Sequence, residues 1–152
     1  APVARTASGR RRPPSRPTMT HFLDGLVAFL GYFGGAVALA VAYLAIYIRL
    51  TPHREFDLLV REHNASAALA IGASLVGFAI PMSRAVAQAT SIVEFVAWGL
   101  VALVVQVGAY LAARLVHPDL SRAIEANAIS AAIWLASVSL TAGLVSAAAM
   151  TE

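Results

Sequence analysis

Long apolar runs separated by short polar segments dominate this chain. Four runs without a charged residue lie at about 26–48, 65–80, 95–113 and 128–150. About 20 apolar residues in helical form cross the roughly 30 Å hydrocarbon core of a bilayer. Polar and apolar residues do not alternate within these runs, which favours helices over the strands of a closed barrel. The pattern predicts an all-α integral membrane protein with four transmembrane helices, the second ending at Pro81.

The composition supports this fold class and excludes others. Of 152 residues, 59% are hydrophobic and 12% are charged, whereas soluble domains carry about 25% charged residues. These values exclude a soluble enzyme domain. They argue equally against a disordered protein and against a nucleic-acid-binding protein. The chain has no Cys, so a disulfide framework, a thiol nucleophile and a Cys-bound metal are excluded as well.

Residues 1–18 differ from the rest of the chain, because they are rich in Arg and Pro and contain no apolar run. This composition predicts a disordered basic N-terminal tail. The alternative is a polybasic arm that binds anionic lipid. Met19 is a candidate natural start, and residues 19–152 then form the four-helix transmembrane domain.

The positions of the Arg residues predict the orientation in the membrane. Short loops rich in Arg favour the cytoplasm, and the first and third loops, residues 49–63 and 114–126, carry most of the Arg outside the tail. These are Arg49, Arg54, Arg61, Arg114 and Arg122. We therefore expect both loops to be cytoplasmic and both termini to be outside, provided that the Arg residues of the tail are discounted.

A shift of 63 residues aligns the two halves of the chain. Four of the matched pairs are Tyr47 with Tyr110, Glu62 with Glu125, Asn64 with Asn127 and Ser74 with Ser137. We expect two parallel two-helix repeats related by an axis along the membrane normal. Such repeats occur in some transporters, but a duplication without transport explains the pattern equally well. The loops that contain Pro52 and Pro118 are predicted to form short amphipathic helices.

Small residues at four-residue spacing predict where the helices approach one another closely. The candidate packing positions are Gly31, Gly35, Gly77 and Gly143. Small residues allow this approach in lipid, where no hydrophobic force drives helix association. Packing within one chain is the first interpretation, and self-association of several copies is the second.

A few polar residues fall within or at the ends of the predicted spans. Gln106 lies near the middle of the third span. One interpretation is a hydrogen bond between helices, with Ser74 or Ser137 as the partner; the other is that Gln106 lines a polar pathway. Asn64 and Asn127 lie where the second and fourth spans begin. They either satisfy backbone groups there and pair with each other, or form with Glu62 and Glu125 an acidic polar ring at the inner face that attracts cations.

Chemical machinery is not visible in the sequence. No Ser–His–Asp order, paired buried carboxylates, HExxH sequence or phosphate-binding glycine loop is present. The four His residues lack the spacing of metal ligands. We therefore predict no catalytic residue, no cofactor and no bound metal. The expected partners are the lipid bilayer, further copies of the chain and a cytoplasmic protein at the loops, without nucleic acid.

The order of several short motifs points to a family. The chain contains Thr51-Pro52-His53-x-Glu55, Asn64-x-x-Ala67-Ala68, Gly77-Phe78-x-Ile80-Pro81, Ala97-Trp98-Gly99 with Gln106 downstream, and Ala147-Ala148-x-Met150-Thr151. From Met19 to Thr151 this string resembles the YjfL family of small bacterial inner-membrane proteins, whose domain has no known function. The resemblance implies four helices in the plasma membrane and no established reaction, in a genetic setting that suggests envelope maintenance.

Two departures from the family pattern are visible. Members often have Gly where this chain has His63, and Asn where it has Ser146.

Two hypotheses about the function remain open. The first is a non-enzymatic, oligomeric envelope-stress or docking component. The second is an ion channel or small transporter formed by an oligomer.

Overall fold

The structure is a computed structural model that describes residues 19–51, 58 and 63–150. Its helices are α1 (Met19–Leu50), α3 (Ala65–Gln88), α4 (Ile92–Val116), α5 (Leu120–Glu125) and α6 (Ile129–Ala149). All of these except α5 are long and apolar enough to cross a membrane. The described part of the chain contains no strand. The predicted all-α membrane fold with four spanning helices is therefore confirmed.

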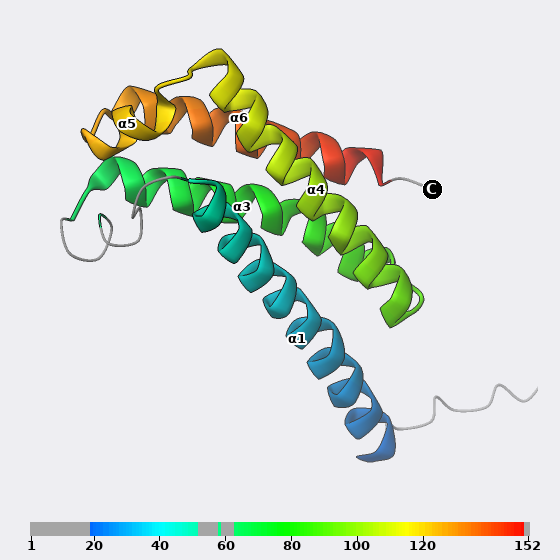
Figure 1. The fold of residues 1–152 in the computed structure, drawn as a ribbon. Helices are drawn as coiled ribbons and strands as arrows, with labels where there is room; N and C mark the ends of the chain where they lie inside the picture. The colour runs from blue at the N-terminus through cyan, green and yellow to red at the C-terminus, as the bar shows by residue number, and fades with distance from the viewer. Residues whose placement is uncertain (1–18, 52–57, 59–62, 151–152) are drawn as a thin grey trace, which may run out of the picture.

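The four long helices form a bundle in which α3 and α6 lie side by side and run in the same direction (Figure 1). The end of α1, the start of α3 and the whole of α5 gather at one end of the bundle, called here the α5 end. The short turn between α3 and α4 lies at the opposite end, as does the start of α1. The N-terminal tail and most of the first loop, residues 1–18, 52–57 and 59–62, lie outside the described residues.

The second spanning helix continues beyond its expected end. Helix α3 runs through Pro81 to Gln88, although Pro lacks the N–H that would bond the carbonyl four residues earlier. That carbonyl belongs to Gly77, and it faces Gly143 of α6. A proline is tolerated inside a membrane helix when a neighbouring helix covers the freed carbonyl, and the close approach of α6 supplies this cover.

The core is built around the pairing of α3 with α6, which is the most extensive contact between helices. Fully buried side chains from α3, α4, α5 and α6 fill it; the larger ones are Phe78, Phe95, Leu120, Ile124 and Leu135. Helix α5 buries Leu120 and Ile124 while Arg122 and Glu125 are exposed, which is the amphipathic helix expected for the third loop. Between residues 52 and 62 of the first loop only Leu58 is described, and it is helical and buried.

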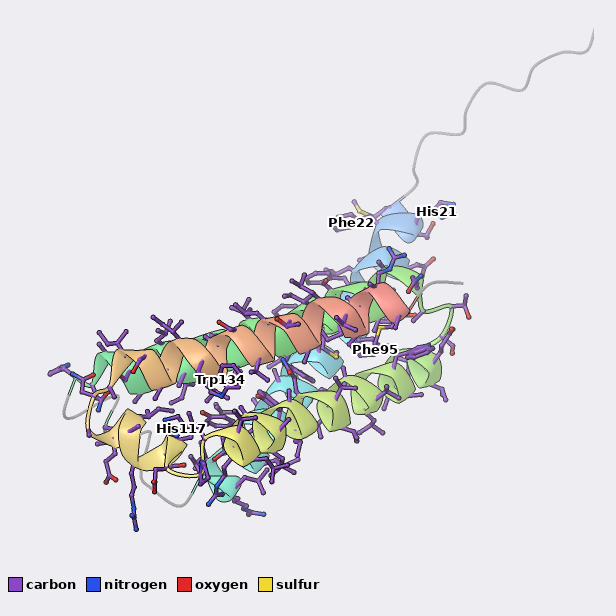
Figure 2. The ribbon with its side chains drawn as sticks, turned by 90° about the horizontal axis from the view of Figure 1, so that it is seen from above. His21, Phe22, Phe95, His117 and Trp134 are labelled. Carbon is purple, nitrogen blue, oxygen red and sulfur yellow. The ribbon has the colours of Figure 1, made fainter. Side chains whose placement is uncertain are left out.

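Helix α1 is only partly covered by the rest of the bundle. Its 32 residues exceed the length that a single crossing needs, and its buried residues are Tyr43 and Tyr47, both in its second half. The first half exposes large apolar side chains such as Phe22, Phe29 and Phe33. Figure 2 shows His21 and Phe22 projecting from a segment that stands clear of the other helices.

Candidate functional site

Polar side chains gather at two levels of the bundle. The first level, called here the asparagine junction, consists of Asn64 and Asn127 at the α5 end, together with the backbone groups that they bond. The second, the central polar contact, joins Gln106 of α4 to Ser139 of α6. Asn64, Gln106 and Ser139 are all buried, so both levels lie between helices.

Asn64 links the start of α3 to the end of α5. Its Oδ1 accepts a hydrogen bond from the backbone N–H of Ala67 at 2.9 Å, which makes it the N-cap of α3. Its Nδ2 donates to the carbonyls of Ile124 at 3.0 Å and Glu125 at 3.1 Å. Because one amide satisfies three backbone groups from two helices, it fixes how α3 and α5 meet.

Asn127 completes the junction from the other half of the chain. Its backbone adopts the left-handed conformation, with φ of 58°, and its Oδ1 accepts from the N–H of Ser66 at 3.1 Å. Both asparagines thus serve the first turn of α3, where N–H groups lack partners within the helix. The two amides bond backbone groups and not each other. Of the acidic residues assigned to the inner face, Glu125 is exposed and Glu62 lies outside the described residues.

The central polar contact differs from the one expected. Gln106 is 1% exposed, and its Nε2 donates to the Ser139 carbonyl at 3.2 Å and to Ser139 Oγ at 3.1 Å. Ser74 or Ser137 was the expected partner. Ser137 instead faces outward and donates to the Ile133 carbonyl at 2.8 Å, while Ser74 hydrogen-bonds Tyr43.

The sequence contained a signal for the correct partner. Ser139 lies four residues before Gly143, so both belong to one face of α6, and that face packs against α3. Ser137 lies two residues away from Ser139, which turns it about 200° around the helix axis. The four-residue spacing from Ser139 to the small residue Gly143 therefore indicates Ser139 as the inward hydroxyl.

Gly77 and Gly143 bring α3 and α6 into backbone contact beside the central polar contact. A Cβ added to Gly143 would overlap the Gly77 carbonyl, and one added to Gly77 would lie 2.6 Å from the Ser139 carbonyl oxygen. A side chain at Gly77 would also collide with the Gln106 amide. The bundle is closed at this crossing, because no room remains for even a methyl group.

Gly31 and Gly35 lie where α1 meets α4. A Cβ on Gly31 would be 3.5 Å from Ile92 Cδ1, and one on Gly35 would be 2.8 Å from Phe95 Cε1. Aromatic rings line the same contact: the centroids of Tyr32 and Phe95 are 5.4 Å apart, and those of Tyr47 and Tyr110 are 5.3 Å apart. Each of these pairs is separated by 63 residues, the spacing of the proposed repeat, which itself stays a prediction.

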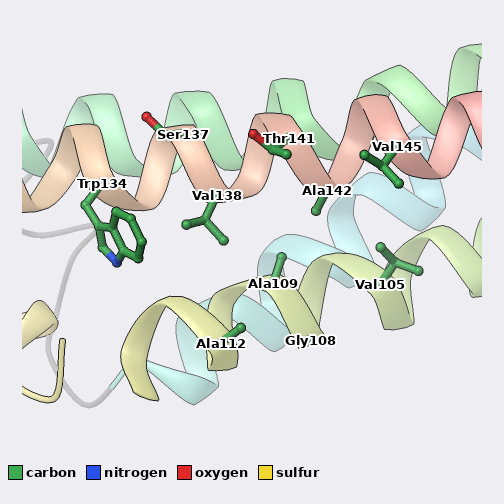
Figure 3. A pocket seen from close by; sticks show the side chains of 10 residues that line it. All are labelled: Val105, Gly108, Ala109, Ala112, Trp134, Ser137, Val138, Thr141, Ala142 and Val145. Carbon is green, nitrogen blue, oxygen red and sulfur yellow. The ribbon is translucent and has the colours of Figure 1, made fainter. Parts of the chain in front are cut away.

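Ser137 lies in a groove on the outer surface and not in the interior. The groove runs between α4 and α6, has a volume of about 550 Å³ and is lined largely by Ala, Gly and Val (Figure 3). Trp134 stands at one end of it, where its Nε1 donates to the Ala113 carbonyl at 3.2 Å. Sequence reasoning assigned no role to Trp134, although aromatic residues with a polar edge are typical of helix ends in membranes.

Glu94, at the opposite end of the bundle, has a structural role. Its carboxylate accepts hydrogen bonds from the N–H and the hydroxyl of Thr90 at 2.9 and 2.8 Å. In return, Ser91 Oγ accepts a hydrogen bond from the Glu94 N–H at 3.2 Å. These three hydrogen bonds together cap the start of α4. Within residues 19–51 and 63–150, no three His, Asp or Glu side chains come together in a way that could hold a metal ion.

The fold and these contacts define a multi-pass helical membrane protein in which the asparagine junction and the central polar contact join helices to one another. The chain belongs to the family described as Domain of Unknown Function (DUF350), which matches residues 21–150. It is 39% identical over 131 residues to the UPF0719 inner membrane protein YjfL of Escherichia coli (strain K12), a match that covers 86% of this chain and 98% of that relative.

The protein of the same name from Escherichia coli O157:H7 matches with the same identity and coverage. No solved structure matches the chain. The resemblance inferred from the motifs is therefore confirmed. With its four spanning helices, the chain is a multi-pass inner membrane protein.

Proposed function

We propose that this protein is a non-catalytic, self-associating component of the inner membrane that docks protein partners at its α5 end, as part of envelope maintenance. The observation that carries the proposal is the start of α1, residues 19–30, which are all exposed, include a row of large apolar side chains and precede the contact of α1 with α4. A second copy can cover this segment and complete a larger assembly.

The character of the interior supports a structural role. Every buried polar residue in the described chain is an uncharged amide or hydroxyl: Thr51, Asn64, Ser66, Ser74, Gln106, Ser121 and Ser139. General acid–base catalysis needs a titratable group with a suitable pKa held near its substrate, and nucleophilic catalysis needs an adjacent base. Uncharged groups that bond helix backbones are suited to positioning helices.

The absence of Cys from the sequence makes a direct test of self-association possible. Gly25 lies in the exposed start of α1 with open space around it, so Gly25→Cys introduces the single thiol of the chain. Oxidation of native membranes is expected to give a disulfide-linked dimer. Leu115→Cys is the matched control, because position 115 is 82% exposed and belongs to the last turn of α4, and this end of α4 lies far from the start of α1 (Figure 1).

Equal crosslinking of both variants would contradict a specific contact through α1, as would a monomer in native mass spectrometry from lipid nanodiscs. The docking role is tested separately by recovery of the protein from native membranes. A specific loop-dependent partner is expected, and recovery of the chain alone would contradict docking while leaving self-association intact.

One observation favours the second candidate, an ion channel or small transporter formed by an oligomer. Gln106 Oε1 is buried without a partner in the described chain, as expected for a group that contacts water or an ion. Asn64, Ser74 and Asn127 would line the remainder of that pathway, whereas Ser137 faces outward and lies outside it. Ion flux in proteoliposomes decides between the candidates, since absence of flux removes the channel and unchanged flux in Gln106→Leu removes this lining.

A further inference from the structure

Two buried polar groups on α4 are left without a hydrogen-bond partner. Gln106 Oε1 and the Tyr110 hydroxyl are both inaccessible and bond no described residue, and their side chains are 1% and 3% exposed. Buried polar groups in proteins are almost always satisfied by protein or by ordered water. Two such groups one helical turn apart on α4 therefore point to a bound molecule.

The orientation of the Gln106 amide is fixed by its partner. The Ser139 backbone carbonyl can only accept a hydrogen bond, so the amide nitrogen must face it. Exchange of the nitrogen and oxygen would place two acceptors against each other. The Oε1 atom consequently points away from Ser139, and its need for a donor does not depend on an arbitrary assignment of the amide.

Gln106 and Tyr110 occupy neighbouring positions on one face of α4. Residues four apart on a helix have Cβ atoms about 5–6 Å apart, and long helical side chains lean towards the helix N-terminus. Tyr110 therefore leans over the turn that holds Gln106. Its ring is fixed edge-on against Tyr47, with centroids 5.3 Å apart, so the hydroxyl cannot swing out to solvent.

We propose that one internal water molecule bridges Gln106 Oε1 and the Tyr110 hydroxyl. The water donates to Oε1 and shares a second hydrogen bond with the phenol, which satisfies both groups. Buried waters make about three hydrogen bonds to polar groups of this kind. A neutral occupant fits, because the buried polar residues of the described chain carry no charge that would balance a cation.

The sign of a stability change tests the proposal. Without water, Tyr110→Phe removes an unsatisfied hydroxyl and the apparent Tm rises or stays unchanged. With the bridging water, the same substitution removes a hydrogen bond, and we expect Tm of the full chain in nanodiscs to fall by about 2–4 °C. Tyr32→Phe, in the same helix bundle but half-buried, is the matched control and should change Tm little.

A spectroscopic measurement observes the site directly. The sequence has two Gln residues, Gln88 and Gln106, so Gln88→Ser combined with labelling by ¹³C-glutamine leaves Gln106 as the one labelled side-chain amide. We expect its infrared carbonyl band at the lower frequency of a hydrogen-bonded amide, and a shift towards higher frequency when Tyr110→Phe is added. A band at the frequency of a free carbonyl would overturn the proposal.

Replacement of Na⁺ by K⁺ or choline distinguishes a cation from water. An internal water predicts the same band position and the same Tm in all three salts. A band that follows the cation would overturn the assignment of water and place an ion at Oε1. None of these readouts depends on self-association, so the water site and the proposed function can fail separately.

Discussion

His63 and Asn127 place two non-glycine residues in the left-handed region of the backbone, with φ of 52° and 58°. A residue with a side chain pays about 1–2 kcal/mol for this conformation, while Gly is unaffected and Asn tolerates it. This conformation gives a physical reason to expect Gly at position 63, as the resemblance to the family implied, in place of His63. The exposed His63 side chain makes no hydrogen bond among described residues that would justify the conformation.

We predict that His63→Gly stabilises the protein by about 1 kcal/mol, which raises the apparent Tm by about 2–4 °C. Thermal unfolding in detergent micelles measures this shift. Asn127→Gly is the matched comparison, because the backbone conformation is the same but the hydrogen bond to Ser66 N–H is lost. Its Tm should fall, and a rise in both variants would contradict a bonding role for Asn127.

Asn64 accepts one hydrogen bond and donates two, so substitutions can separate these roles. Asn64→Asp keeps the acceptor for Ala67 N–H but places a carboxylate oxygen against the Ile124 and Glu125 carbonyls. We expect Asn64→Asp to lower Tm at pH 7 more than Asn64→Ala, which itself loses about 1–3 kcal/mol.

The effect of Asn64→Asp should depend on pH with a definite sign. Facing carbonyl oxygens raise the pKa of the introduced carboxyl in the folded state above its ordinary value. Its protonated form can donate a hydrogen bond, so the loss of stability relative to the natural chain should shrink as pH falls. A difference that is constant between pH 7 and pH 4 would show that Nδ2 contributes little.

At the scale of helices, the α3–α6 crossing depends on Gly77, Gly143 and Pro81 acting together. Pro81 frees the Gly77 carbonyl, and Gly143 has no side chain to keep that carbonyl at a distance. We predict that Gly143→Ala and Gly77→Ala each destabilise the protein by about 1–3 kcal/mol through overpacking. Equilibrium unfolding in mixed micelles measures the difference.

Two other glycines provide matched controls for the crossing. Gly72 lies in α3 and Gly108 in α4, and a Cβ on either would meet nothing within 4 Å. Gly72→Ala and Gly108→Ala should leave stability unchanged or slightly raised, since Ala is the better helix former. Equal losses in all four variants would mean that helix propensity, and not the close crossing, determines the effect.

Helix number and type followed from the sequence because apolar length alone determines them. Helix ends did not, because the fate of Pro81 depends on a neighbouring helix that the linear pattern does not show. The partner of Gln106 was mispredicted for a related reason. Ser74, Ser137 and Ser139 are equivalent as residue types, so only the four-residue spacing from Ser139 to Gly143, which marks the face of α6 that packs against α3, distinguishes Ser139.

At the scale of the whole molecule, the charges of the described residues are distributed unequally between the two ends of the bundle. Arg49, Arg114 and Arg122 belong to the α5 end, while Arg84 lies near the turn between α3 and α4. Arg114 also donates to the Leu50 carbonyl at 3.5 Å, which places its charge beside the end of α1. An excess of Arg marks the cytoplasmic side of short loops.

We therefore predict that the α5 end is cytoplasmic, and single thiols in this Cys-free chain can show it. Thr90→Cys lies in the turn between α3 and α4, and Ala126→Cys follows α5; both positions are exposed. A membrane-impermeant maleimide should label position 90 in intact spheroplasts and position 126 only after permeabilisation. The reverse result would mean that the Arg residues of segment 1–18 outweigh those of the loops, since these two groups favour opposite orientations. Removal of residues 1–18 should then restore the predicted labelling, because the remaining Arg residues favour a cytoplasmic α5 end.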